Sequence, residues 1–245
     1  MIRYKIIIEY DGLDFVGWQS QDNGISIQES IEKACKKLFK EKVMLFGARR
    51  TDAGVHAKGQ VAHFDVSKEM QLDNIRDGLN QYLRPLPIAI LEAKEVKEDF
   101  HARFSAKLRT YEYLVINRRP PLTIERNKAW CVYSKLNKEE MTQASKLFEG
   151  RHDFSSFRSV NCQSNSSIKT INKCQIHFKS EFISILVTAK SFLHSQVRII
   201  VGTLIDVGRG KIFSEDIKKI IEGKDRSKAG STAPPYGLYL LKVDY

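Results

Sequence analysis

The alternation of apolar and polar residues divides the first half of the chain into short strands and amphipathic helices. Residues 2–10 alternate with a period of two, which predicts a strand that ends at the Asp11-Gly12 turn. Ser26-Ile27-Gln28-Glu29 has the pattern of a helix capping box and opens an apolar stripe with helical spacing. Further strands are expected at 43–48, 60–66 and 88–96, and a second helix at 72–83. The predicted order of elements is β-α-β-β-α-β.

The second half repeats this order with insertions. The pattern predicts a strand at 108–117, a helix from Asn137 to Phe148, strands at 170–179 and 182–189, helices from about Leu193 to Gly208 and from Ser214, and a strand at 237–243. This order is typical of ferredoxin-like units. We therefore expect an α+β fold of two ferredoxin-like halves, residues 1–104 and 105–245. Their strands are expected to join into one mixed, mainly antiparallel sheet with the helices packed on one face.

Composition narrows the class of protein without fixing its function. The 245 residues carry 40 Lys and Arg against 29 Asp and Glu, a formal net charge of +11. Such an excess favours a polyphosphate partner, although solvated surface lysines alone would produce the same charge. No apolar run is long enough to span a bilayer, and the N-terminus lacks the features of a signal peptide, so we expect a cytoplasmic protein without membrane partners. The four cysteines are scattered and indicate neither a zinc site nor a disulfide framework.

The densest group of reactive side chains lies at residues 47–57, between two predicted strands. Asp52 is flanked there by Arg49, Arg50 and His56. A neighbouring cation stabilises the ionised form of a carboxylate, and an ionised carboxylate suits a nucleophile or a base better than a general acid. The alternative from spacing alone is an Asx-turn in which Asp52 caps its own loop.

Six motifs in the same order resemble the TruA family of tRNA pseudouridine synthases. One segment resembles the family motif that contains the catalytic residue: Arg50-Thr51-Asp52-Ala53-Gly54-Val55-His56-Ala57. The other matching segments are 10–12 with 15–21, 100–106 with 109–113, 150–154, 192–193 with 196–198 and 201–202, and 232–240. Together these segments cover most of the chain.

The resemblance implies an isomerase that converts uridine to pseudouridine in the anticodon stem-loop of tRNA, at tRNA positions 38–40. The N-glycosidic bond breaks, the uracil turns, and its C5 atom is joined to C1′ of the ribose. The product is an isomer of the substrate, so no redox or energy cofactor and no metal are expected, and the sequence has no P-loop, dinucleotide fingerprint or metal-ligand spacing. The resemblance also implies the pseudouridine synthase fold, a homodimer, and an active-site cleft that the second half completes.

The resemblance also assigns roles to four residues. Asp52 matches the essential aspartate, Tyr111 the tyrosine that stacks on the target uracil, and Arg198 a basic residue that pairs with the catalytic carboxylate. Arg50 matches an arginine that fills the space left when the nucleotide flips out. From the residues alone, a core tyrosine is the favoured interpretation of Tyr111, and Arg198 could extend its guanidinium to solvent.

The sequence departs from the family pattern at two positions. Arg49 stands where the family usually has glycine. If the loop required a positive φ there, the arginine would strain the backbone. Gln196 stands where many relatives have methionine, a change expected to alter only local packing. Basic residues near the motifs are candidates for a phosphate-binding rim: Arg49, Arg50, Lys58, Arg103, Lys107, Arg109, Arg151 and Arg158.

Two other functions remain open from the sequence. A family member could modify other uridines or ribosomal RNA, because the motifs constrain the reaction better than the RNA target. A non-catalytic RNA-binding protein is the second alternative, and the presence of Asp52, Tyr111 and Arg198 argues against it.

Overall fold

The computed structural model describes residues 1–21, 24–160 and 162–245, and the chain divides into two compact units. Unit 1 consists of Met1–Lys107 together with Tyr239–Tyr245, and unit 2 consists of Leu108–Leu238. The end of the chain therefore groups with the first half by its contacts, whereas the sequence order placed it with the second.

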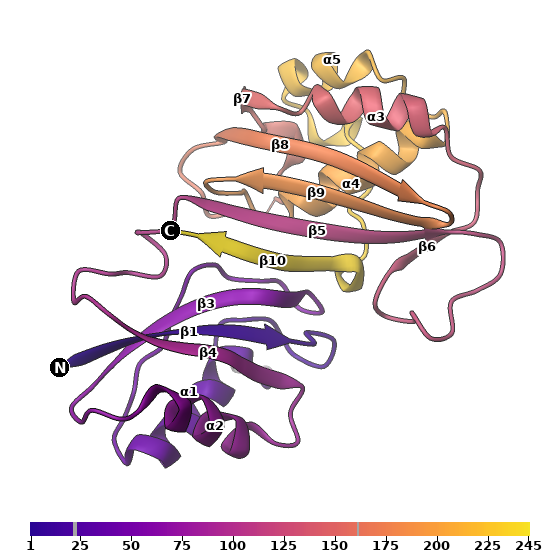
Figure 1. The fold of residues 1–245 in the computed structure, drawn as a ribbon. Helices are drawn as coiled ribbons and strands as arrows, with labels where there is room; N and C mark the ends of the chain where they lie inside the picture. Colours follow the sequence, from indigo (N-terminus) through magenta and orange to yellow (C-terminus); the bar gives the residue numbers. More distant parts are fainter. Residues whose placement is uncertain (22–23, 161) are drawn as a thin grey trace. The chain divides into compact units, whose positions relative to one another are not determined.

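Unit 1 has the topology of a ferredoxin-like unit (Figure 1). Its elements are β1 (Ile2–Tyr10), α1 (Ile27–Phe39), β2 (Phe46–Gly47), β3 (His56–Val66), α2 (Leu72–Leu83), β4 (Ile88–Val96) and most of β10 (Leu238–Asp244). Strands β4, β1, β3 and β2 pair in that order, all antiparallel. β10 pairs in parallel with the start of β3, and α1 and α2 lie side by side against this sheet.

Local sequence explains the main elements of unit 1. β1 alternates buried and less buried residues, which places Tyr4, Ile6 and Ile8 in the core. α1 begins at the predicted cap, where Ser26 Oγ accepts a hydrogen bond from Glu29 N at 3.2 Å. α2 ends at Leu83, directly before Arg84-Pro85, because proline cannot continue a helix.

Unit 2 is also built on mainly antiparallel strands, which belong to the same ten-stranded sheet as those of unit 1. Its elements are β5 (Leu108–Asn117), β6 (Trp130–Val132), α3 (Lys138–Lys146), β7 (Gly150–Asp153), β8 (Ile168–Lys179), β9 (Phe182–Ala189), α4 (Gln196–Gly208) and α5 (Asp216–Gly223). Strands β5, β9, β8 and β7 pair in that order, and the short β6 runs parallel to the end of β5. α3 packs on β8 and against α4, which also contacts β5.

Several predicted boundaries were wrong. The strand expected at 43–48 is reduced to Phe46–Gly47, and β3 begins at His56 rather than at residue 60. β6 and β7 were not expected. α4 begins at Gln196, three residues later than expected, because Ser195 has a left-handed backbone conformation with φ of 58°.

The α+β class and the mainly antiparallel pairing are confirmed. Within the described part of the chain, ten strands and five α-helices form these two units. None of the helices in those residues is both long and apolar enough to cross a membrane.

Candidate functional site

Asp52 lies on the loop 48–55 that connects β2 to β3 in unit 1. The carboxylate residue is half-buried, Thr51 before it is buried, and Arg50 is exposed. The backbone N–H of Val55 donates to the carbonyl oxygen of Asp52 at 3.2 Å, and Gly54 between them has a φ of 75°. The turn therefore sets the direction of the Asp52 side chain through its backbone.

The segment that follows β1 fixes this loop through Thr51. The hydroxyl groups of Tyr10 and Thr51 are 2.8 Å apart in a buried hydrogen bond. Trp18 N donates to the carbonyl oxygen of Thr51 at 3.1 Å. Both the side chain and the backbone of the residue before Asp52 are thus held in place. A loop carboxylate anchored in this way can present the same geometry to every substrate molecule.

Two glycines allow the same segment to approach the loop closely. A Cβ atom on Gly12 would lie 1.9 Å from the carbonyl oxygen of Val55, and one on Gly17 would lie 2.7 Å from that of Thr51. Gly17 also has a φ of 115°, a conformation that L-residues with a side chain rarely adopt. The sequence motif at residues 10–18 is therefore a backbone clamp on the Asp52 loop.

His56, at the end of the loop, is buried, and its protonation state decides which of two neighbours it can hydrogen-bond. Its Nδ1 atom lies 3.0 Å from the backbone nitrogen of Gly12 and 2.8 Å from Asp11 Oδ1, and its ring stacks on Tyr239 with centroids 4.8 Å apart. The Nδ1 atom of a neutral imidazole can accept a hydrogen bond from Gly12 N–H, whereas an imidazolium would donate a hydrogen bond to Asp11.

The backbone strain that a positive φ would cause does not arise at Arg49. It is not among the described non-glycine residues with positive φ, which are Lys40, Asn127, Ser180, Ser195 and Lys224. Its carbonyl oxygen accepts a hydrogen bond from Gln60 Nε2 at 2.7 Å, and Ala48 N donates to the carbonyl oxygen of Val61 at 2.7 Å. The loop therefore tolerates a side chain where relatives usually have glycine.

Tyr111 lies on β5 in unit 2. Its ring meets that of Phe192 nearly edge to face, with centroids 5.3 Å apart and an interplanar angle of 86°. Only 5% of the residue is exposed. This contact fixes the orientation of the tyrosine ring.

Arg198 lies in the first turn of α4 and is tied to residues 231–234. Its Nε–H donates to the carbonyl oxygen of Ala233 at 2.7 Å, and Ala233 N donates back to the carbonyl oxygen of Arg198 at 3.1 Å. The close approach depends on Gly202, because a Cβ there would lie 1.7 Å from the carbonyl oxygen of Ser231. Tyr113 Oη donates to the carbonyl oxygen of Pro234 at 2.8 Å, which links the same segment to β5.

Gln196 has a defined hydrogen bond that methionine could not make. Its Oε1 accepts from Leu193 N at 2.8 Å, and the residue is 1% exposed. Its Nε2 is the buried side-chain nitrogen that lacks a hydrogen-bond partner among the described residues. Gln196 therefore adds a local hydrogen bond to the change in packing expected at this position.

The candidate phosphate-binding rim loses one member. Arg109 is buried and donates from Nη1 to the carbonyl oxygen of Lys190 at 2.6 Å, so it belongs to the interior of unit 2. Lys58 remains exposed and places its ammonium 4.9 Å from the centre of the Tyr239 ring. The described residues contain no group of three or more His, Cys, Asp or Glu placed to hold a metal ion.

The predicted site residues are thus distributed over both units. Unit 1 carries Arg50 and Asp52 on one loop, and unit 2 carries Tyr111 and Arg198 on adjoining elements. The pairing of Arg198 with Asp52 stays a prediction. The segments 10–12 and 15–21 were predicted as part of a family motif, with no role for Tyr10, Gly12 or Gly17. Two glycines close to an aromatic residue after a strand were the available signal for a close backbone approach.

Comparison with known proteins gives the family. The family model of the tRNA pseudouridine synthases matches residues 6–105 and 144–245. Proteins named tRNA pseudouridine synthase A are similar over the whole chain. The one from Ehrlichia ruminantium (strain Welgevonden) is 53% identical, and the alignment covers all of both chains. The one from Maricaulis maris (strain MCS10) is 48% identical, and the alignment covers all of this chain and 98% of the relative. The protein of that name in Anaplasma phagocytophilum (strain HZ) is 48% identical with both chains fully covered. The chain is therefore a member of the TruA family of tRNA pseudouridine synthases, and it is an isomerase.

Proposed function

We propose that this enzyme isomerises uridine to pseudouridine in the anticodon stem-loop of tRNA, at positions 38–40, and that Asp52 is its essential catalytic residue. The observation that carries the proposal is the anchored loop: a half-buried carboxylate follows a threonine whose side chain and carbonyl are both held by residues 10–18. Such support suits a carboxylate that must keep one geometry for chemistry.

The reaction requires one bond to break and one to form at the same ribose carbon. The bond from C1′ to N1 of uracil breaks, the base rotates, a bond forms from C1′ to C5, and C5 loses its proton while N1 gains one. Three roles suit an ionised carboxylate: nucleophilic attack on the ribose, nucleophilic attack on the base, or removal of a ribose proton to give a glycal. In each role the negative charge of Asp52 is needed at the start.

Tyr111, Arg198 and Arg50 are proposed to bind the flipped nucleotide. An extruded base loses its stacking partners, so an aromatic ring and a cation in the pocket offset part of that cost. Because only 5% of Tyr111 is exposed, stacking on uracil requires the neighbouring side chains to move as the nucleotide enters. Arg50 is already exposed on the Asp52 loop, as a residue that fills the vacated space must be.

The resemblance also supports a homodimer that acts on tRNA in the cytoplasm. The net charge of +11 suits a tRNA partner, because binding to phosphates releases condensed counterions.

A comparison of RNA from cells with and without this protein tests the proposed target. Pseudouridines are mapped in total RNA from both strains. Loss confined to the anticodon arm of tRNA supports the proposal, and loss in ribosomal RNA supports the alternative target. An unchanged map, together with tRNA binding by the purified protein, would support a non-catalytic RNA-binding protein.

A further inference from the structure

Two exposed phenylalanines of unit 1 belong to one row of rings. Phe104 is 74% exposed and Phe46 is 42% exposed. The His101 ring lies between them, with its centroid 4.4 Å from that of Phe104 and 5.8 Å from that of Phe46. The guanidinium carbon of Arg103 is 5.5 Å from the centre of the Phe104 ring. We call Phe46, His101, Arg103 and Phe104 the aromatic row.

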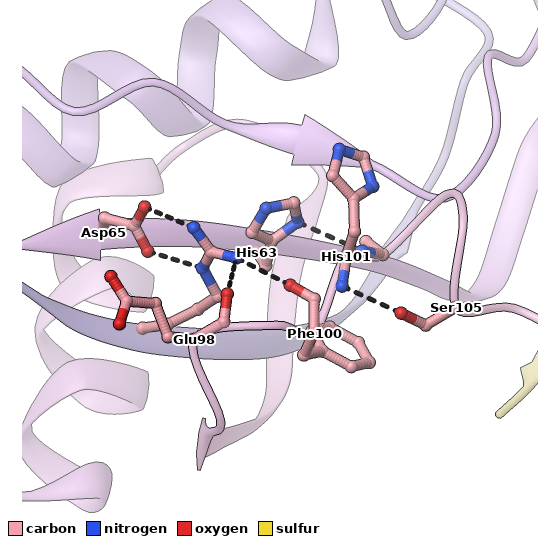
Figure 2. A network of polar contacts seen from close by, with 8 residues as sticks. His63, Asp65, Glu98, Phe100, His101 and Ser105 are labelled. Atoms are coloured by element: carbon pink, nitrogen blue, oxygen red, sulfur yellow. Dashed lines mark hydrogen bonds and ion pairs between the residues drawn. The ribbon is translucent and has the colours of Figure 1, made fainter.

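A polar network holds the segment that carries this row (Figure 2). His101 N donates to Ser105 Oγ at 2.9 Å, and His101 Nδ1 accepts from Arg103 N at 3.1 Å. Ala102 N donates to Nδ1 of His63 on β3 at 3.1 Å. The exposed rings therefore stand on a fixed backbone.

Arg3 joins the same segment to the sheet. It forms two hydrogen bonds of 2.7 Å to the carboxylate of Asp65 and also donates to the carbonyl oxygens of Phe100, at 2.9 Å, and of Glu98. Rings that are already ordered lose little conformational entropy when a ligand stacks on them. The network therefore holds the His101–Ser105 segment in place before a ligand arrives.

The two histidines of the network are neutral at pH 7. Burial lowers the pKa of His63 to about 4, with smaller contributions from His101 and Arg3. Burial, with smaller contributions from Arg3 and Arg103, also lowers the pKa of His101. A neutral imidazole supplies an uncharged π surface, so the row combines three flat rings with one guanidinium. Unpaired bases stack on surfaces of this kind.

We propose that the aromatic row is a stacking platform for an unpaired base of the RNA substrate. Phe46 lies on β2 opposite His63 of β3, and the loop that carries Arg49, Arg50 and Asp52 follows β2 in the chain, so the platform and the proposed catalytic loop belong to the same unit. Exposed rings on an enzyme that binds RNA can receive an unpaired base at some distance from the reacting nucleotide, because every base has a flat face that stacks on an aromatic ring. The identity of the RNA rests on the proposed function.

The test compares the tRNA affinity of Phe104→Ala and Phe46→Ala with that of Phe213→Ala. Phe213 is a suitable control because it is also an exposed phenylalanine, at 65%, and lies in unit 2. Loss of one stacked base predicts a dissociation constant about 5- to 150-fold higher for Phe104→Ala. The Phe213→Ala variant should bind like the wild type. KM should rise with Phe104→Ala while kcat stays near the wild-type value.

A second variant separates stacking from structure. Phe104→Trp should retain tRNA affinity, and tRNA should quench the fluorescence of the introduced indole more strongly than that of Phe213→Trp.

Wild-type affinity in Phe104→Ala would overturn the inference even if the enzyme makes pseudouridine. Loss of self-association in Phe104→Ala, seen by sedimentation and sufficient to explain weaker RNA binding, would identify the row as a subunit interface and overturn it too. Absence of pseudouridine formation by the wild type would instead count against the proposed function.

Discussion

The hydroxyl of Tyr10 lies 2.8 Å from that of Thr51, the residue directly before Asp52. This contact joins the last residue of β1 to the proposed catalytic loop across 41 positions of sequence. It connects β1, which pairs with β3 over most of its length, to the loop that carries the proposed catalytic carboxylate.

We expect Tyr10→Phe to lower the free energy of unfolding by about 0.5–1.5 kcal/mol, because it removes one buried hydrogen bond. The turnover number should fall as well, since Thr51 then holds the loop less firmly. Tyr4→Phe is the matched control: it removes a hydroxyl on the same strand that hydrogen-bonds the backbone of Met70, away from the loop. Urea denaturation and single-turnover kinetics should show similar destabilisation in both and slower turnover only in Tyr10→Phe. Equal turnover in the two variants would count against the anchoring role.

Gly12→Ala should displace the loop. The added Cβ would lie 1.9 Å from the carbonyl oxygen of Val55, so backbone has to move, at a cost of about 1–3 kcal/mol in stability. Gly223→Ala serves as the control because nothing lies within 4 Å of its added Cβ. Thermal unfolding and pseudouridine assays of the two variants test this expectation. Wild-type activity in Gly12→Ala would show that the clamp does not control the loop.

Arg198→Lys should reduce activity although it keeps the positive charge. Lysine lacks the Nε–H that donates to Ala233 at 2.7 Å, and its ammonium cannot reproduce the planar guanidinium. Misplacement of the cation by about 1 Å can cost as much as about 100-fold in rate. The control is Arg209→Lys at the C-terminal end of the same helix, where Arg209 pairs with Asp206. Comparable kcat values in both variants would argue against a special role for Arg198.

The fold should lose stability as the pH falls from about 6.5 towards 4, partly because of His63. Its pKa is lowered from 6.5 to about 4, so between these values the unfolded chain binds a proton that the folded chain does not. This stability is fully present above pH 6.5. One such group changes the free energy of unfolding by no more than about 1.4 kcal/mol per pH unit.

Urea denaturation between pH 4.5 and 7 measures this dependence. His63→Gln should flatten it, whereas His177→Gln, at an exposed position, should leave it unchanged. A slope in His63→Gln as steep as in the wild type would mean that other groups cause the loss of stability.

The sequence predicted the elements in which apolar residues recur with a regular period or form one continuous run. The bounds of β1, β4, β5 and β9 were predicted to the residue, because each alternates or forms a continuous apolar run between clear turn signals. β6 spans three residues, too few to show a period. β3 begins early at His56 because Tyr239 and Leu240 pair with its first residues, and that pairing joins distant parts of the chain.

The residues proposed for the site could be named from the sequence, but the contacts that support them could not. A cluster of Arg, Asp and His in a short loop is visible in the sequence, and the resemblance assigned Asp52 a role. The anchors of that loop, Tyr10, Gly12 and Gly17, come from another element, and their effect depends on distances that no local pattern contains. The contact of Arg198 with Ala233 is likewise set by the packing of α4 against a loop 35 positions later.

The central claim is that the carboxylate of Asp52 performs the chemistry, and Asp52→Asn tests it most directly. The variant keeps the size of the side chain and removes its charge, and Asp14→Asn, at an exposed position after β1, is the control. The measurement is pseudouridine formed from tRNA under single-turnover conditions, with tRNA affinity measured on the same preparations. We predict no pseudouridine with Asp52→Asn, undiminished tRNA affinity, and normal activity with Asp14→Asn. Pseudouridine formation by Asp52→Asn at the wild-type rate would contradict the account.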